Sequence, residues 1–414
     1  MLCQFSVRNY KSIKEEITLD MQAASISEHP EHLLTDIDNE SFLPIAAIYG
    51  PNGGGKSNVL QAMSVLIKKI MVPICAVRPN NECGDGYDSI KSPIIETFKF
   101  SDKNRKSPTQ FELFFRTEKL EYKYNIDILG DKVMFESLYK KSIDSTRKTL
   151  LFERNINTEK EYRLNGSFKN FKISELSDNI PLLSYITMTY GKNAIALDIF
   201  RWLESGISIL NFGSYRTDNS LNLKELENYK DILISIFKEL DIDIADYRII
   251  DKENDFDIMT KHIIDGDNCE LNLSEESSGT KRLFAIMPRI LKSLVIGTTL
   301  VIDELDAKLH PKLLRYIIEL YSDKKINTKK AQLIFTSHDL STMNSDVFRR
   351  DEIWFVAKNN EQATSLYSLV EFKDEDGKSI RKDARFDKQY LEGRYGADPY
   401  LRRIIDWEGL ANEV

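Results

Sequence analysis

Residues 48–59 read Ile-Tyr-Gly-Pro-Asn-Gly-Gly-Gly-Lys-Ser-Asn-Val and match every fixed position of the P-loop pattern, at Gly50, Gly55, Lys56 and Ser57. Three consecutive glycines lack a Cβ atom, so this turn can bring successive backbone N–H groups against phosphate oxygens. A helix that starts near Lys56 would add unpaired N–H groups and the positive end of its dipole. The stretch therefore predicts a phosphate-binding turn.

The residues on both sides of the turn support this prediction. Residues 44–49 are apolar and predict a buried strand, and residues 58–70 carry apolar side chains at helical spacing. In a P-loop, Lys56 would reach the β and γ phosphates of a nucleotide, and the Ser57 hydroxyl would ligate Mg²⁺. The alternative is a glycine-rich turn that binds nothing.

Size and composition favour a large protein with an ordinary soluble composition. The chain has 414 residues, which predicts two lobes or a domain with an insertion. We find no apolar run near the roughly 20 residues that span a bilayer. Several charged residues lie among the first 20 positions, where a signal peptide would need an apolar centre. We therefore expect a cytoplasmic protein with no membrane partner. A net charge of −8 argues against a surface that is basic all over, but it leaves room for a local nucleic-acid groove.

The cysteines and three of the histidines receive no functional role. Cys3, Cys75, Cys83 and Cys269 match neither a zinc spacing nor a disulfide framework, which predicts buried or incidental thiols. His29, His32 and His262 fall in stretches that we expect to be polar loops.

The N-terminus and the middle of the chain change period twice. Residues 2–8 alternate and residues 17–21 form a second strand, which predicts a hairpin. Six β-like segments then predict an antiparallel meander: 94–100, 111–116, 120–129, 132–139, 149–154 and 161–164. From residue 173 to about 240 the period is helical, which predicts an inserted helical subdomain. No heptad register persists, so we expect no long coiled coil.

Two acids follow a second buried strand. Residues 299–302 are apolar or β-branched, and Asp303 and Glu304 come directly after them. The carboxyl ends of strands are where open α/β sheets hold ligands. Asp303 would hold Mg²⁺, directly or through water, and Glu304 would orient the attacking water. A solvated strand end is the alternative.

Two further segments could face phosphate. The strand at 332–335 leads to His338, whose N–H could reach an oxygen that gains charge during phosphoryl transfer. The turn Ser277-Ser278-Gly279 precedes a helix with an apolar face, and it is either a simple N-cap or a second phosphate-directed helix start.

The last part of the chain is basic. Residues 378–403 hold eight lysines and arginines against four acids, with aromatic residues among them: Phe386, Tyr390, Tyr395 and Tyr400. A solvated face and a partner or nucleic-acid surface are both open interpretations.

The motifs occur in the order Walker A, signature, Walker B, D-loop and H-loop, carried by residues 50–57, 277–279, 303–304, Asp306 and His338. This order resembles the ATP-binding cassette (ABC) class of ATPases. Residues 5–12 and 50–58 resemble the heads of SMC and RecF proteins. The run Asp303-Glu304-Leu305-Asp306, the tripeptide Leu309-His310-Pro311 and residues 390–396 are similar to the AbiL-type ATPases of bacterial abortive-infection systems.

The resemblance implies the fold class. We expect an α/β, ABC-type P-loop NTPase head, with a mixed sheet and an antiparallel β-subdomain. It would carry the inserted β-meander and helical subdomain and no long coiled coil. The expected parts are an N-terminal ATPase lobe at 1–115, the insertion at 116–255, and a C-terminal ATPase lobe at 256–414.

The resemblance also implies a site shared between two copies of the chain, with ATP and Mg²⁺ as cofactors. Each P-loop would face the signature turn of the other copy, where Ser278 and Gly279 would contact the γ phosphate. The implied nucleotide-binding residues are Lys11, Ser12, Asn52, Gly53, Gly54, Gly55, Lys56, Ser57, Asn58, Ser278, Gly279 and Asp306. The implied metal ligands are Ser57 and Asp303, and the implied catalytic residues are Glu304, His338 and Lys56. The signature, Ser-Glu-Glu-Ser-Ser-Gly-Thr, departs from the transporter's Leu-Ser-Gly-Gly-Gln, and Gln110 is the candidate for the Q-loop glutamine.

These implications lead to an expected function. We expect an ATP-hydrolysing switch, a homodimer at minimum, that acts as the sensor or regulator of an antiphage abortive-infection system. Nothing after His338 suggests a nuclease site, so we expect a separately encoded effector protein. The alternatives are a RecF-like DNA-binding repair ATPase and the ATPase subunit of a transporter.

Overall fold

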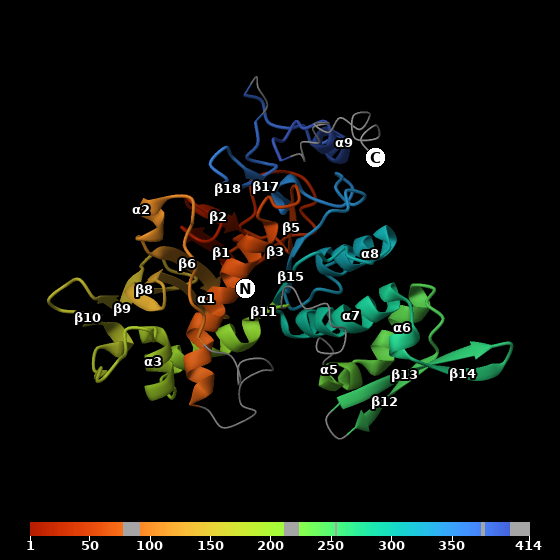
Figure 1. The fold of residues 1–414 in the computed structure, drawn as a ribbon, viewed down its shortest axis with the longest axis horizontal. Coiled ribbons are helices and arrows are strands. Elements are labelled where there is room, and N and C mark those ends of the chain that lie inside the picture. Colours follow the sequence, from red (N-terminus) through yellow and green to blue (C-terminus); the bar gives the residue numbers. More distant parts are fainter. Residues whose placement is uncertain (78–91, 211–222, 253–254, 374–376, 398–414) are drawn as a thin grey trace, which may run out of the picture.

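The computed structural model describes residues 1–77, 92–210, 223–252, 255–373 and 377–397. Two β-sheets form its body (Figure 1). The first sheet has seven strands in the order β10-β9-β8-β7-β6-β1-β2, all antiparallel. Its strands are β1 (Leu2–Arg8), β2 (Ile17–Asp20), β6 (Thr109–Arg116), β7 (Leu120–Leu129), β8 (Lys132–Ser142), β9 (Thr149–Asn155) and β10 (Tyr162–Leu164).

This sheet confirms the predicted hairpin and most of the predicted meander. The two form one continuous sheet, because β1 pairs with β6. The segment at 94–100 is not a strand: it contributes a single bridge, from Ile95 to Gly130. Its Ile95 and Phe98 are buried, whereas Ile94 and Phe100 are exposed.

The second sheet has six strands in the order β11-β15-β16-β5-β17-β18. Its strands are β5 (Ile45–Tyr49), β11 (Ile207–Ile209), β15 (Thr299–Ile302), β16 (Gln332–Thr336), β17 (Ile353–Lys358) and β18 (Thr364–Ser368). The first five are parallel and β18 pairs antiparallel with β17, so the sheet is mixed.

Strand β5 shows how the second sheet is buried on both faces. Ala46 and Ile48 pack in one apolar core with the first sheet and with helix α1 (Lys56–Ala76). The alternate residues, Ile45, Ala47 and Tyr49, pack in a second core with α7 (Ser278–Ile296) and α8 (Pro311–Ser322). Successive strand residues point to opposite faces, so an all-apolar strand is buried on both faces. The sheet therefore separates two apolar cores.

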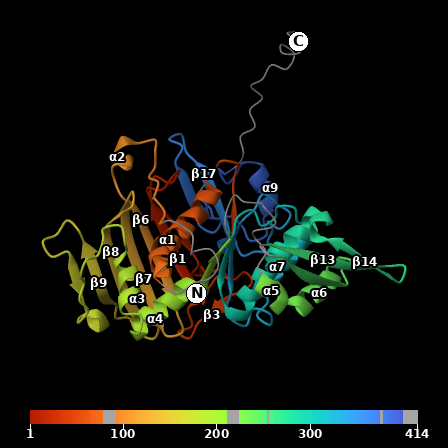
Figure 2. The ribbon, with the colours of Figure 1, turned by 60° about the horizontal axis from the view of Figure 1, so that its bottom comes forward.

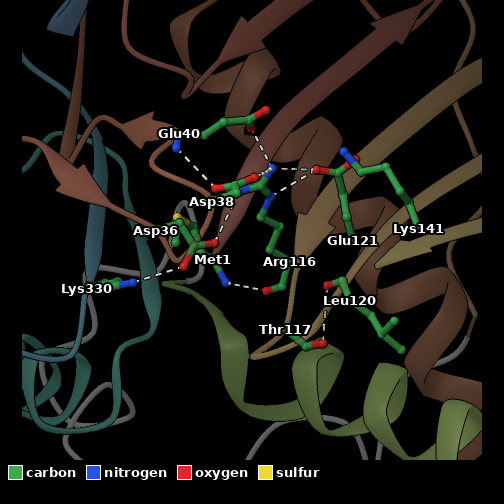
Figure 3. A network of polar contacts seen from close by, with 10 residues as sticks. All are labelled: Met1, Asp36, Asp38, Glu40, Arg116, Thr117, Leu120, Glu121, Lys141 and Lys330. Carbon is green, nitrogen blue, oxygen red and sulfur yellow. Dashed lines mark hydrogen bonds and ion pairs between the residues drawn. The ribbon is translucent and has the colours of Figure 1, made fainter. Parts of the chain in front are cut away.

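Polar contacts also join the parts of the body. The Gln332 side chain on β16 bonds both the N–H and the C=O of Leu2, the first residue of β1 in the other sheet. Figure 3 shows a second junction, at Arg116, whose side chain is fully buried. Its guanidinium pairs with carboxylates of β7 and of the segment around β3 (Leu34–Thr35) and β4 (Ser41–Phe42): Asp36, Asp38, Glu40 and Glu121.

The predicted helical subdomain is divided between the two cores. Helices α3 (Leu182–Thr189) and α4 (Ala194–Arg201) pack with α1 in the first core. Helices α5 (Leu223–Asn228) and α6 (Lys230–Glu239) pack with α7 in the second. Helical period alone does not show which core a helix faces. Two short helices, α2 (Asp102–Arg105) and α9 (Phe386–Leu391), complete the labelled set.

A third sheet was not predicted. It has three antiparallel strands, β12 (Asp246–Lys252), β13 (Asp255–Ile264) and β14 (Asp267–Asn272), and it extends away from the body (Figure 2). His262 lies on β13 and not in a polar loop as expected. The expected boundary at 115/116 falls within the last two residues of β6, and the one at 255/256 falls within β13. The division into three parts stays a prediction.

Helix α1 corrects the expectation about apolar runs. It is 21 residues long and apolar enough to cross a membrane by length and composition, with a mean hydropathy of 1.7 over its most apolar window. However, 72% of that window is buried inside the protein, as in the core helix of a globular fold. It is also the longest helix in the described part of the chain, which contains no coiled-coil arm.

One cysteine differs from its prediction. Cys75, in the last turn of α1, is disulfide-bonded, whereas Cys3 and Cys269 are free. The expectation of thiols throughout is therefore wrong at Cys75, because spacing alone does not determine pairing. Cys83 lies outside the described residues.

Candidate active site

The predicted P-loop connects β5 to α1. Gly55 precedes the first residue of α1 and has a φ of 111°, in the left-handed region. A Cβ atom there would lie 2.3 Å from Oγ1 of Thr364, so both conformation and space require glycine. At Gly50, where φ is 150°, a Cβ atom would lie 2.5 Å from the carbonyl oxygen of Val356. Two fixed positions of the pattern thus have a physical reason in β17 and β18.

Lys56 lies in the field of the acids of the site. Its side chain is buried, and its Nζ donates to the carbonyl oxygens of Gly50 (2.8 Å) and Pro51 (3.2 Å). Burial lowers the pKa of the Lys56 ammonium, while three nearby carboxylates act in the opposite direction: Asp303, Glu304 and Asp306. The first residues after β15 are therefore electrostatic neighbours of the P-loop lysine.

The strand order explains this proximity. Strand β16 lies between β5 and β15, and all three are parallel, so their carboxyl ends meet at one edge of the sheet. Thr336, the last residue of β16, donates its hydroxyl hydrogen to Oδ1 of Asp303 at 2.5 Å. The same hydroxyl oxygen accepts from the backbone N–H of Glu304 at 2.7 Å. Glu304 has a φ of 49°, rare for a residue with a side chain. One hydroxyl thus holds both predicted acids.

Asp306 fixes the backbone next to His338. Its Oδ2 accepts hydrogen bonds from the N–H groups of His338 and Asp339, each at 3.1 Å. Its Oδ1 is buried and has no hydrogen-bond partner among the described residues. The His338 side chain is exposed at this edge. The structure therefore brings Asp306 and His338 together, and their contacts with nucleotide stay predictions.

Ser12 supports the P-loop from the N-terminal hairpin. Its Oγ accepts from the Asn58 side chain at 2.7 Å and lies 2.8 Å from Oγ1 of Thr364. Thr364 in turn donates to the carbonyl oxygen of Gly54 at 2.9 Å. Lys11 reaches Oε1 of Gln61 on α1, at 2.8 Å. Lys11, Ser12 and Asn58 therefore lie near the loop, and their contacts with nucleotide stay predictions. Thr364 was missed, because nothing in its local sequence indicates a contact over such a separation.

The signature turn begins α7, as predicted. Ser277 caps the helix by accepting from the N–H of Thr280, and Ser277 and Ser278 are both exposed. One turn later, the Arg282 guanidinium donates to the carbonyl oxygen of Glu304 at 3.0 Å. A Cβ atom on Gly279 would lie 3.2 Å from the carbonyl oxygen of Lys308, so the turn lies against the D-loop segment of its own chain.

Two sequence hypotheses lose support. Gln110 donates to Asp127 across two strands of the first sheet, as a cross-strand pair, and no contact joins it to the P-loop among the described residues. Ion pairs partly neutralise the described part of the basic end: Arg381 pairs with Asp383, Arg385 with Asp387, and Lys388 and Arg394 with Glu392. Its aromatic residues are core residues: Phe386, Tyr390 and Tyr395 are buried, and the latter two stack on Phe355. Tyr400, Arg402 and Arg403 lie outside the described residues.

Two other features lie apart from this edge. A cavity of about 770 Å³ is found at the far end of α1, lined by Ile74, Val77, Phe171 and Tyr190 among others. His29, Glu31 and His32 are close enough to one another to suggest a metal site. However, the two imidazole rings stack in parallel, 4.6 Å apart, so their lone pairs do not point to one position. Neither feature extends the P-loop site.

The donor set at the sheet edge fits a nucleoside triphosphate with a divalent cation. The P-loop offers backbone N–H groups and an ammonium to phosphate, and Ser57 and Asp303 offer the oxygen ligands that Mg²⁺ prefers. Comparison with protein families supports this chemistry. Residues 45–344, from β5 to beyond His338, match a family described as "AAA domain, putative AbiEii toxin, Type IV TA system". The chain belongs to this family. It therefore contains a P-loop ATPase domain, and the P-loop implies ATP binding.

Solved structures were compared as well. An SMC head bound to the C-terminal winged-helix domain of ScpA is 13% identical, with a TM-score of 0.44 over 89% of this chain and 97% of that one. The SMC head domain of Thermotoga maritima is 15% identical, with a TM-score of 0.37 over 89% and 98%. A Pyrococcus yayanosii Smc head with a coiled coil is 9% identical, with a TM-score of 0.40 over 89% and 97%. This chain has a mixed α/β fold of its own, and its TM-scores to these SMC heads are all below 0.5. The search of curated proteins found no match.

Proposed function

We propose that this protein is an ATP-hydrolysing switch whose ATP site is completed by a second copy of the chain. The observation that carries the proposal is the meeting of five predicted site residues at one sheet edge. Lys56, Asp303 and Glu304 share one electrostatic environment, and Asp306 joins His338 to it. The exposed start of α7 is the surface that a second copy would require.

Each residue has a defined part in this proposal. Lys56 and the N–H groups of the P-loop bind and orient the phosphates, and Ser57 and Asp303 hold the cation, which neutralises charge when bound. Glu304 orients the attacking water, and the exposed His338 faces the γ phosphate. Phosphoryl transfer depends mainly on positioning and charge neutralisation, so this set is sufficient. Ser278 and Gly279 of the second copy would close the site.

The biological role in the proposal is antiviral defence in the cytoplasm. The matched family is described by a toxin of a toxin–antitoxin system. The motifs at 303–311 and 390–396 resemble AbiL-type abortive-infection ATPases. In this role the ATPase senses an invader and controls a separately encoded effector. A RecF-like repair ATPase is the main rival, and tight DNA binding that weakens steeply with salt would favour it. Co-purification with a membrane protein would favour the transporter subunit.

The substitution Glu304→Gln tests the proposal. It keeps the size of the side chain but removes the carboxylate that orients water. We expect ATP turnover to fall by about 10²-fold or more, while ATP binding persists and an ATP-dependent dimer accumulates. Turnover is measured by phosphate release and assembly by light scattering.

Two variants serve as controls for this test. Glu319→Gln removes an exposed acid on α8 that pairs with Arg315, and it should change neither quantity. Lys56→Ala should prevent both nucleotide binding and assembly. Wild-type turnover in the Glu304→Gln variant would contradict the catalytic assignment.

A further inference from the structure

The third sheet is attached directly to the signature turn. After β14 ends at Asn272, the chain makes one 3₁₀ turn, Leu273–Glu275, and α7 begins at Ser278. The Asn272 side chain accepts from the N–H of Ser274, and Glu275 accepts from the N–H of Asn272, so a capping box makes this connection rigid. A movement of β14 would thus reach the signature turn within a few residues.

A second connection runs from the middle of β13 to Glu276, the residue immediately before Ser277. Oε1 of Glu276 accepts the hydroxyl hydrogen of Thr260 at 2.5 Å and lies 2.7 Å from Nε2 of His262. Thr260 is fully buried, and the side chains of Glu276 and His262 are 10% and 15% exposed. Hydrogen bonds to a charged group that is largely withdrawn from water are stronger than exposed ones. The Glu276 carboxylate therefore fixes the signature turn to β13, although the strand directly before the turn in the sequence is β14.

The two connections hold the turn from both sides. The capping box fixes its start to β14, and Glu276 fixes its end to β13, directly before the Ser277 cap of α7. β13 and β14 pair over six residues, with His262 opposite Cys269 and Thr260 opposite Leu271. The strands and the turn thus form one closed unit, and the orientation of Ser278 and Gly279 follows the orientation of the sheet.

We propose that Glu276, held by Thr260 and His262, is a positioning residue that sets the signature turn for contact with the nucleotide of a second copy. The inference rests on the proposed shared site and adds a control element to it. In this arrangement the projecting β12–β13–β14 sheet determines whether Ser278 and Gly279 can close on the γ phosphate. Glu276 itself does not touch nucleotide.

The substitution Glu276→Ala tests the inference in the full-length protein. We expect ATP-dependent dimer formation and the turnover number to fall by about 10-fold, as for a lost charged hydrogen bond. The dissociation constant of a fluorescent ATP analogue for the isolated chain should stay within about twofold of wild type. The P-loop is distant in sequence from Glu276, and no contact joins the two among the described residues. A merely structural role would instead lower the thermal unfolding temperature and weaken nucleotide binding together.

Variants of the partner residue separate hydrogen bonding from packing. His262→Gln keeps an N–H donor near the position of Nε2 and should retain most of the ATP-dependent assembly. His262→Leu should behave like Glu276→Ala. Glu270→Ala is the matched control: it removes an exposed acid on β14 that pairs with Arg248. Glu270 lies between Cys269 and Leu271, which are opposite His262 and Thr260, so its side chain is on the other face of the sheet. This variant should be unchanged.

The outcomes distinguish the inference from the proposed function. Ser278→Arg should block ATP-dependent assembly if the shared site exists. If Ser278→Arg blocks assembly and Glu276→Ala does not alter it, the inference is overturned and the shared site stands. If Ser278→Arg assembles normally, the proposed shared site is itself wrong.

Discussion

A single hydroxyl group connects both acids of the candidate site to the neighbouring strand. Thr336 is fully buried, donates to Asp303 and accepts from the N–H of Glu304. Its position matters because Glu304 has a strained backbone, which the surrounding contacts must hold. The geometry of the acids is therefore set partly by β16 and not only by their own strand.

This arrangement makes Thr336→Val informative. Valine has nearly the same shape but leaves the Glu304 N–H without its acceptor and Asp303 without its donor. We expect ATP turnover to fall by at least about 10-fold and the free energy of unfolding by about 1–3 kcal/mol. Phosphate release and urea unfolding measure the two effects. Thr336→Ser keeps the hydroxyl and should retain most of the activity; equal losses in both variants would contradict the assignment of the effect to the hydroxyl.

Residue identities could be predicted from sequence where a motif fixes them, as at Lys56, Asp303 and Glu304. The partners of those residues could not. The contact of Thr336 with Asp303 depends on the register of β15 against β16, and the contact of Thr364 with Gly54 depends on β18. Register and sheet order arise from tertiary packing, which a single sequence does not display.

Secondary-structure elements also differ in how far the sequence alone could predict them. The buried strands at β5, β15 and β16 were predicted within one or two residues, because continuous apolar runs bounded by polar turns are distinctive. The core against which each helix packs was not predicted. Helix α3 packs on α1, and its start is held by Glu136 of β8, whose carboxylate accepts from the N–H groups of Leu182 and Leu183 and from the Tyr124 hydroxyl.

That buried carboxyl predicts a pH effect on stability. Burial raises the pKa of Glu136 to about 7, although its three hydrogen bonds act in the opposite direction. The folded protein then binds a proton that the unfolded chain, with an ordinary carboxyl pKa near 4.5, has released. The contribution of Glu136 to the free energy of unfolding is thus full below about pH 4.5 and falls by about 3 kcal/mol as the pH rises through 7.

The measurement compares wild type with Glu136→Gln by urea unfolding between pH 4.5 and 7.5. Because glutamine does not titrate, the difference between the two proteins isolates this group from other buried acids such as Glu352. We expect the wild type to lose stability relative to the variant as the pH rises. A constant difference over this range would mean that the carboxyl titrates normally.

At the scale of the whole molecule, the proposal requires two copies that each supply half of a site. Mixing two inactive variants tests this. Lys56→Ala lacks a working P-loop but has an intact signature turn, and Ser278→Arg has the opposite defect. Because neither variant assembles with itself, every dimer in the mixture contains one of each and has one intact site of two, so we expect up to about half of wild-type turnover.

The mixture must be compared with each variant alone at the same total concentration. Both should be inactive by themselves, and activity should appear on mixing. If the mixture stays inactive although both variants fold and Ser278→Arg binds ATP, the second half of the site does not come from another copy. Activity of Ser278→Arg alone would have the same meaning.

Helix α1 gives the molecule a mechanical property. It begins at the phosphate loop and, at 1.5 Å per residue, extends about 31 Å to the disulfide-bonded Cys75 and the cavity beside α3. Most of this helix is buried, so we expect it to move as one stiff unit. A tilt of about 3° at Lys56 would displace the other end of the helix by about 1.6 Å. Close-packed side chains leave too little free space to absorb such a displacement. A change in the conformation of the phosphate loop would then move the residues that line the cavity at the other end of the helix.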